Sequence, residues 1–248
     1  MLDFKFCYFG TLTSTNDKAK EFSKKGLSNI VAAADKQTKG RGRFNRTWNS
    51  GLGGLYMTIA LRENDLDNVK YLTFIAAVSV AKTIRKISGL NAKVKWPNDV
   101  LLNDKKVCGI LTETISGKEN YALVGIGINI NQKIFSKNIT KIATSLKIET
   151  NKNYNIKNIS KTIIKNFDSL YNYYNKKNYN EIIRIWKKHS HTIGKKIKVK
   201  TLKGNYIGKA VDIDKDCSLI LKLKNGKIKK IVEGDIFSFP ACTRSTPF

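Results

Sequence analysis

Cysteine and histidine are sparse in this sequence, and their spacing excludes several kinds of site. The 248 residues hold four cysteines, Cys7, Cys108, Cys217 and Cys242, and no two of them form a C-x-x-C pair. This spacing argues against a zinc site and favours reduced thiols in the cytoplasm. The two histidines stand in the segment 189–191 without cysteine or carboxylate at ligand spacing, so they indicate a helix end rather than a metal site.

Long apolar runs are also missing. No segment approaches the roughly 18 consecutive apolar residues that a membrane-spanning helix needs. The first seven residues alternate between polar and apolar side chains and lack the charged-then-apolar order of a secretory signal. A hydrophobic content of 41% is nevertheless enough for a sizeable core. We therefore expect a cytoplasmic protein with no membrane partner.

Acidic residues are few, with 19 Asp and Glu against 46 Lys and Arg, which gives a net charge of +27. Such a balance is typical of nucleic-acid-binding proteins. Here, however, lysine supplies most of the charge, and lysine, asparagine and isoleucine crowd the whole chain, which indicates a compositional bias rather than a patch. We expect no specific nucleic-acid binding, and a field that favours acidic partners and anionic ligands such as ATP.

Two short segments carry the strongest chemical signal. The first runs from Gly40 to Trp48 and combines two glycines, three arginines and a tryptophan. Glycine allows close approach of the backbone to a ligand, arginine forks bind carboxylate and phosphate, and tryptophan offers a flat face for stacking. The second is Lys95–Asp99, which reads KWPND, and it is followed by KKVCGIL at 105–111. By itself the first segment is equally consistent with a basic surface loop.

The hydrophobic pattern predicts two domains, a mixed α/β domain over 1–193 and a small β-barrel over 194–242, followed by a tail at 243–248. Apolar residues recur at helical spacing in 69–87, 156–174 and 179–188. Beyond Gly194 the period changes to two, and Asn225-Gly226 between alternating runs is typical of a hairpin. Further strands are expected at 2–8, 30–35, 55–61, 94–95, 100–102, 107–115 and 121–130. Short helices are expected at 16–25 and 139–146, and an exposed connection at 147–157.

In order and spacing, these segments resemble the biotin protein ligases. The resemblance begins at Ser14-Thr15-Asn16, continues through Gln37 and the segments above, and reaches 125–131. Asn45 stands where the family has glycine and Gly51 where it has proline, and asparagine tolerates left-handed backbone angles. The resemblance implies a class II synthetase-like mixed sheet with flanking helices, then a small SH3-like barrel. It also implies a ligase without the N-terminal helix-turn-helix of the repressor members, because the motifs begin at residue 14.

The implied reaction joins biotin to a lysine of a biotin carboxyl carrier protein, a subunit of acyl-CoA carboxylases. Biotin first reacts with ATP to give biotinyl-5′-AMP, and the carrier lysine then displaces AMP. Since two anions meet in the first step, cations are needed where charge accumulates. The family's catalytic roles fall on Lys106, Arg43 and Asp99. Asp99 also matches a position suited to Mg²⁺, which accepts one carboxylate together with phosphates.

The resemblance assigns contacts to both ligands. Biotin contacts fall on Ser14, Thr15, Gln37, Gly40, Arg41, Arg43, Lys106, Gly109 and Leu111. Contacts to ATP or the adenylate fall on Arg41, Arg43, Trp48, Asn98, Lys106 and Asn129. Ser14 and Thr15 are equally suited to cap a helix, and Trp48 to anchor the core.

Two other functions stay open on the sequence. One is a lipoate–protein ligase, an acyl-adenylate ligase of the same fold group, although the arginine loop with KWPND favours biotin. The other is a basic nucleic-acid-binding module built on the barrel, which lacks the aromatic residues of strand-binding surfaces. A monomer and a homodimer are equally compatible with the sequence.

Overall fold

The computed structural model describes residues 2–137 and 139–238, so Cys242 and the predicted tail at 243–248 lie outside the described residues. Contacts divide the chain into two compact units, Met1–Ser190 and His191–Phe248. The mixed α/β class and the following all-β unit are both as predicted. None of the described helices is long and apolar enough to cross a membrane.

The first unit is built on a seven-stranded mixed sheet in the order β1-β2-β3-β7-β6-β5-β4. β1 and β2 pair in parallel and the other neighbours are antiparallel. The central strands are buried along nearly their whole length. The strands are β1 (Lys5–Leu12), β2 (Ile30–Gln37), β3 (Gly54–Arg62), β4 (Lys93–Lys95), β5 (Asp99–Leu102), β6 (Lys105–Ile115) and β7 (Tyr121–Asn129).

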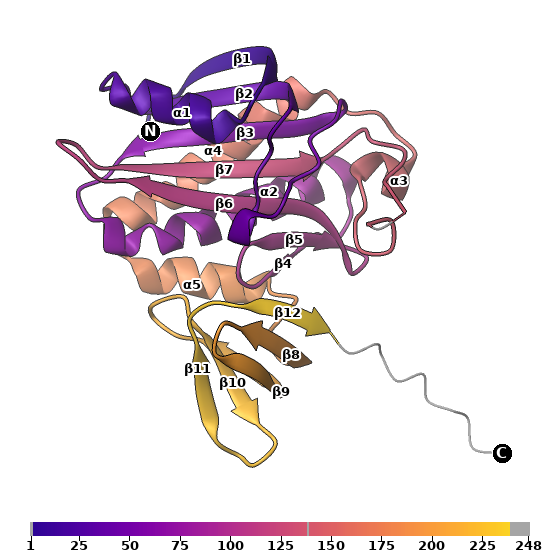
Figure 1. Ribbon diagram of the computed structural model, residues 1–248. Coiled ribbons are helices and arrows are strands. Elements are labelled where there is room, and N and C mark those ends of the chain that lie inside the picture. The colour runs from indigo at the N-terminus through magenta and orange to yellow at the C-terminus, as the bar shows by residue number, and fades with distance from the viewer. Residues whose placement is uncertain (1, 138, 239–248) are drawn as a thin grey trace. The chain divides into compact units, whose positions relative to one another are not determined.

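Helices cover both faces of this sheet (Figure 1). α1 (Thr15–Lys24) packs on β2, β3 and β7, while α2 (Lys70–Ser88) contacts β6 and packs against α4 (Ile156–Asn175) and α5 (Tyr179–Lys188). The ring of Phe74 stacks on Trp186 at 4.6 Å between ring centres, and both side chains are fully buried. Short 3-10 turns lie at η1 (Arg43–Asn45) and η2 (Leu66–Asn68).

The predicted helix at 139–146 is wrong, and the predicted connection at 147–157 is right only for residues 151–155, which link α3 to α4. Residues 139–142 form hydrogen-bonded turns, and the helix α3 begins later, at Leu146, and ends at Thr150. The reason is the cap, because the Ser145 hydroxyl accepts a hydrogen bond from the Ile148 backbone N–H and fixes the start of the helix there. α4 then begins at Ile156, which is the start that the apolar spacing predicts, so the connection ends two residues earlier than expected.

One carboxylate is buried away from the sequence motifs. Glu63 is 7% exposed and accepts hydrogen bonds from the hydroxyls of Tyr171 and Tyr174 of α4 at 3.0 and 3.1 Å. Burial raises the pKa of Glu63, although both phenol hydrogen bonds oppose the shift. This cluster joins the end of β3 to α4 and has no place in the predicted chemistry.

The second unit is a five-stranded antiparallel sheet in the order β11-β10-β9-β8-β12. Inward residues of β8 alternate with outward lysines, which is the period-two pattern of the sequence. The predicted hairpin forms, with Gly226 at φ 81° in the turn between β10 and β11. The strands are β8 (Lys196–Thr201), β9 (Gly204–Ile213), β10 (Leu219–Leu223), β11 (Ile228–Ile231) and β12 (Asp235–Ser238).

Candidate functional site

Three glycines at the centre of the seven-stranded sheet expose the strand backbone to contact by other side chains. Gly109 of β6 lies opposite Gly127 of β7, and Gly125 is two residues earlier on β7. A Cβ atom on Gly127 would lie 2.4 Å from Nε1 of Trp48, and a Cβ atom on Gly125 would lie 2.4 Å from Oδ1 of Asn16. Two side chains from outside the sheet therefore rest directly on strand backbone, which only glycine permits at these positions.

Trp48 forms one wall of this area. Its backbone N–H donates to the carbonyl of Gly40 at 3.0 Å, which closes the arginine loop at its base. Its indole Nε1 is buried and has no hydrogen-bond partner among the described residues. Above the ring, the ammonium of Lys106 lies 5.3 Å from the ring centre. The indole ring thus contacts the strand backbone at Gly127 and also lies close to a cation.

Lys106 forms the centre of charge in the site. Its ammonium lies 2.5 Å from a carboxylate oxygen of Asp99, and the two side chains are 34% and 19% exposed. The backbone of Lys106 is held on its other side, because its N–H donates to Ile142 and its carbonyl accepts from Thr144. A lysine fixed in this way presents its charge without having to be ordered by the ligand.

Cys108 lies beside these groups in sequence but does not join them. Its side chain is buried, and burial raises the pKa of the thiol far above its ordinary value. A thiol that stays protonated is a poor nucleophile, so the chemistry of the site rests on its lysine, arginine and carboxylate groups.

Asn98 is locked onto β6 and meets the arginine loop. Its side-chain amide nitrogen donates to the backbone carbonyl of Ile110 at 2.7 Å, and its backbone carbonyl accepts from the Ile110 N–H at 2.9 Å. Its remaining side-chain oxygen accepts a hydrogen bond from Nη1 of Arg43 at 3.4 Å. The guanidinium of Arg43 also lies over the ring of Phe44, 4.7 Å from its centre. The second arginine of the loop is thus directed to the KWPND segment.

A second group of polar side chains surrounds the start of α1. The hydroxyl of Ser14 caps the helix by accepting from the Asn16 N–H, which fulfils the capping role predicted for it. The N–H and hydroxyl of Thr15 both donate to Oε1 of Gln37, at 2.7 and 3.1 Å. The amide of Gln37 donates in turn to Ser50 at 2.9 Å. These groups are the amide and hydroxyl donors and acceptors that a urea-like ring would need.

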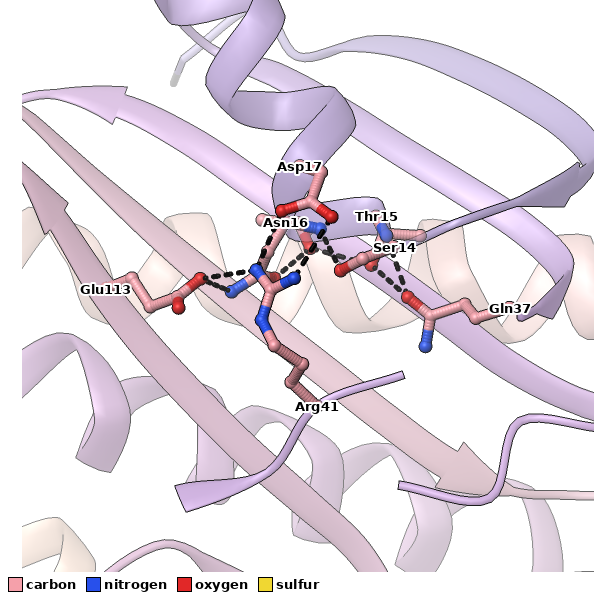
Figure 2. A network of polar contacts seen from close by, with 8 residues as sticks. Ser14, Thr15, Asn16, Asp17, Gln37, Arg41 and Glu113 are labelled. Carbon is pink, nitrogen blue, oxygen red and sulfur yellow. Dashed lines mark hydrogen bonds and ion pairs between the residues drawn. The ribbon is translucent and has the colours of Figure 1, made fainter. Parts of the chain in front are cut away.

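Thr58 of β3 connects this group to Asn16. Its hydroxyl lies 2.8 Å from the Thr15 hydroxyl and 2.6 Å from Oδ1 of Asn16. The side-chain amide of Asn16 then donates to Glu113 of β6. Figure 2 shows the polar network that extends from Gln37 through the start of α1 to Glu113 and Arg41.

The arginine loop is folded tightly in this structure. Gly40 is buried, and a Cβ atom there would lie 2.4 Å from the Ser50 hydroxyl oxygen and 2.5 Å from the Trp48 carbonyl oxygen. Asn45 has φ of 56°, in the left-handed region that glycine would otherwise supply. Gly51 accepts a hydrogen bond from the Tyr56 hydroxyl through its carbonyl at 2.7 Å, a contact that does not depend on its side chain.

Of the predicted residues, Asn129 is connected to Lys106 through Thr144. Its side chain is buried and donates to the carbonyl of Thr144 at 3.0 Å, and the N–H of Thr144 donates to Lys106. Leu111 lies opposite Gly125 in the β6–β7 register. Sequence reasoning missed Asp17, Thr58 and Glu113 as members of the site. Asp17 and Glu113 each lie two residues beyond a predicted position, but no spacing rule distinguishes them from surface carboxylates.

For magnesium, the described residues hold no cluster of three or more His, Cys, Asp or Glu side chains. Mg²⁺ does not need such a cluster, since it keeps several waters and takes most of its ligands from phosphates. Asp99 supplies one carboxylate next to Lys106, which suits an ion that arrives with a nucleotide.

Comparisons with known proteins agree with this geometry. Residues 6–131 match the Biotin/lipoate A/B protein ligase family, and residues 192–238 match the Biotin protein ligase C terminal domain. The bifunctional ligase/repressor BirA of Bacillus subtilis is 36% identical over 236 residues, which cover 92% of this chain and 72% of that protein. The biotin–[acetyl-CoA-carboxylase] ligase of Paracoccus denitrificans is 36% identical over 122 residues, 48% of this chain and 50% of that protein.

Among solved structures, the biotin protein ligase from Aquifex aeolicus in complex with biotin and ATP superposes with a TM-score of 0.84. It is 29% identical, and the match covers 94% of this chain and 97% of that one. The similarity therefore extends over both units of the chain.

Proposed function

This chain belongs to the Biotin/lipoate A/B protein ligase family, and we propose that it attaches biotin to a lysine of a biotin carboxyl carrier protein at the expense of ATP. The observation that carries this is the placement of Lys106, Asp99 and Trp48 at the strand backbone of Gly109, Gly125 and Gly127. Beside it, at the start of α1, lie the polar side chains of Ser14, Thr15, Gln37 and Ser50, which we call the hydroxyl and amide group. One end of the site is charged for phosphate chemistry, and the other is neutral and polar for a urea-like ring.

In the first step, a carboxylate oxygen of biotin attacks the α-phosphorus of ATP. The bond from that phosphorus to the bridging oxygen breaks, and pyrophosphate leaves with the electron pair, which gives biotinyl-5′-AMP. Both reactants are anions, so their approach depends on cations that are already in place. We assign this role to Lys106, which is fixed by its backbone and by Asp99, and to Arg43, which donates a hydrogen bond to Asn98. Asp99 would supply the protein ligand for a Mg²⁺ ion that arrives with ATP, and such an ion would neutralise phosphate charge.

In the second step, the neutral amine of the carrier lysine attacks the acyl carbon of the mixed anhydride. The bond to the phosphate oxygen breaks, AMP leaves, and the nitrogen loses one proton as the amide forms. Asp99 is the carboxylate nearest Lys106, and we assign it the positioning of the incoming amine. Trp48 and the closed arginine loop shelter the anhydride from water, whose attack would waste it.

We assign ring binding to the hydroxyl and amide group, with Ser14, Thr15 and Gln37 toward the ring and Gly40, Gly109 and Leu111 as backbone positions. Trp48, Asn98 and Asn129 are assigned to the adenylate side. The first unit, predicted as residues 1–193, carries all of these groups, and the second, predicted as 194–242, is the family's C-terminal module. Absence of specific nucleic-acid binding stays a prediction, as does the choice between monomer and homodimer.

The test is direct. The protein is mixed with biotin, MgATP and an apo carrier domain of acyl-CoA carboxylase, and the carrier is weighed by mass spectrometry. A gain of one biotinyl group on one lysine is the expected result. A carrier variant with that lysine changed to arginine is the control. Lipoate in place of biotin distinguishes the two ligases of the family, and we expect pyrophosphate exchange with ATP only when biotin is present.

A further inference from the structure

Arg41, the first arginine of the loop, has its charge occupied by two carboxylates of the chain itself. Its two terminal nitrogens donate to the two oxygens of Asp17 at 3.0 and 2.8 Å. One of these nitrogens also lies 3.5 Å from a carboxylate oxygen of Glu113. Figure 2 shows the guanidinium between α1 and β6, beside Asn16. The two-pronged contact with Asp17 is the strongest geometry that an arginine and a carboxylate form.

The charges at this point disfavour an incoming anion. One guanidinium faces two carboxylates, so the group of Arg41, Asp17 and Glu113 carries a net charge of about −1 at neutral pH. A carboxylate or phosphate placed there would be repelled by Asp17 and Glu113 unless Arg41 left both. The cations of Arg43 and Lys106 meet the KWPND segment instead, at Asn98 and Asp99.

The loop is therefore held at two different places. At one place Arg41 joins it to α1 and β6, and at the other Arg43 reaches Asn98 while Trp48 rests on Gly127. Between them the loop is closed by its own backbone, since the Gly42 N–H donates to Arg46 at 2.7 Å. If Arg41 lost its contacts, the loop would separate from α1 and β6 while the turn between Gly42 and Arg46 stayed formed.

We propose that Asp17 and Glu113 are positioning residues that fix Arg41 as the anchor of the arginine loop, and that the reacting anions are bound by Arg43 and Lys106 rather than by Arg41. This role rests on the proposed ligase function, and it changes what the resemblance implies for Arg41. Glu113 contributes twice, because it also accepts from the amide of Asn16 and so joins the anchor to the hydroxyl and amide group.

The test compares removal of the carboxylates with removal of the arginine. The variants are Asp17→Asn with Glu113→Gln, Arg41→Gln, and all three changes together. Glu21→Gln is the matched control, because Glu21 lies on the same helix and pairs with Lys18 at 2.6 Å on the exposed side. Thermal melting of each variant confirms that it is folded.

Loop position is measured first, without biotin or ATP. Trp96 and Trp186 are 1% and 0% exposed, whereas Trp48 is half-buried, so acrylamide quenching of tryptophan fluorescence reports mainly on Trp48. Hydrogen exchange of the 40–48 amides gives a second reading. We expect both to increase by about fivefold in the carboxylate variant and in Arg41→Gln alike, which is the effect expected for loss of a partly exposed ion pair. The control should match the wild type.

Kinetics then separate an anchor from an anion ligand. We expect the same drop in kcat/KM for pyrophosphate exchange in the carboxylate variant and in Arg41→Gln, with no further loss in the triple variant. If Arg41 binds the anions, its loss alone raises KM for ATP by about tenfold or more, while the carboxylate variant keeps or lowers KM, and this would overturn the proposal. Wild-type loop protection in the carboxylate variant would overturn it as well. Failure of the wild type to label the carrier would refute the ligase function instead, and leave the loop measurements standing.

Discussion

Replacement of Lys106 by methionine tests the role assigned to this lysine in the first step, the reaction of biotin with ATP. Methionine keeps most of the apolar stem over Trp48 and removes only the ammonium that lies 2.5 Å from Asp99. Loss of one preorganised donor to developing charge typically raises a barrier by about 3 kcal/mol, which is roughly a 100-fold drop in rate. Because the contacting oxygen of Asp99 is buried, removal of the ammonium leaves it poorly solvated and should lower the free energy of unfolding by about 1 to 3 kcal/mol. The variant should therefore fold and fail in the first step.

The assay is biotin-dependent exchange of labelled pyrophosphate into ATP, together with a thermal melt. Lys105→Met is the matched control, since Lys105 is the preceding residue on β6 and its side chain points to the other side of the strand. We expect the control to exchange at the wild-type rate. Exchange at the wild-type rate by Lys106→Met would remove this lysine from the mechanism, and a melting point far below the control would mean that the residue serves folding instead.

Three further outcomes follow from the structure. Gly127→Ala should displace Trp48, whose indole nitrogen would lie 2.4 Å from the new methyl carbon, and lower adenylation by at least about tenfold, whereas Gly10→Ala, with open space around it, should not. Glu63→Gln should gain stability relative to wild type as pH rises above about 4, where the unfolded carboxyl titrates. Burial raises the folded-state pKa of Glu63 above its unfolded value, so the folded wild type retains a proton that the unfolded chain has lost. Burial, assisted by nearby cations, lowers the folded-state pKa of His189 to about 4, so the unfolded chain binds a proton first as pH falls from 6.5 to 4 and the wild type loses stability. His189→Gln has no such group, so its loss of stability over this range should be smaller by about 1 to 2 kcal/mol. Thermal melts at a series of pH values check both titrations.

Much of the fold could be predicted from local patterns because the patterns are strong. α5 begins and ends at the predicted residues, and the long helices α2 and α4 lie within one residue of their predicted bounds. Apolar spacing decides such helices since packing of one face stabilises them. The error at 139–150 has a local cause as well. The deciding feature there is a serine cap, and several polar residues in that stretch are equally able to provide one.

The candidate site was predictable to a different degree. The glycines, Lys106 and Asp99 lie in short motifs, so the sequence identifies them, and the pairing of β5, β6 and β7 brings them together. The role of Glu113 could not be predicted from the sequence, because it depends on the register of β6 against β7 and on the approach of α1, whose Asn16 lies 97 positions away in the chain. Its strand neighbours alternate as any half-buried strand does, and a carboxylate at such a position gives no signal of a partner.

The scarcity of acidic residues gives these carboxylates their meaning. The chain has 19 of them against 46 cations, yet Asp17, Asp99 and Glu113 all lie in the site and each stands against a cation of the motifs. A site built only to attract anions would leave those cations bare, and in so basic a chain the overall field already supplies the attraction. The local carboxylates instead fix where Arg41 and Lys106 point. Attraction and positioning are thus separated, since the whole chain provides the first and three carboxylates provide the second.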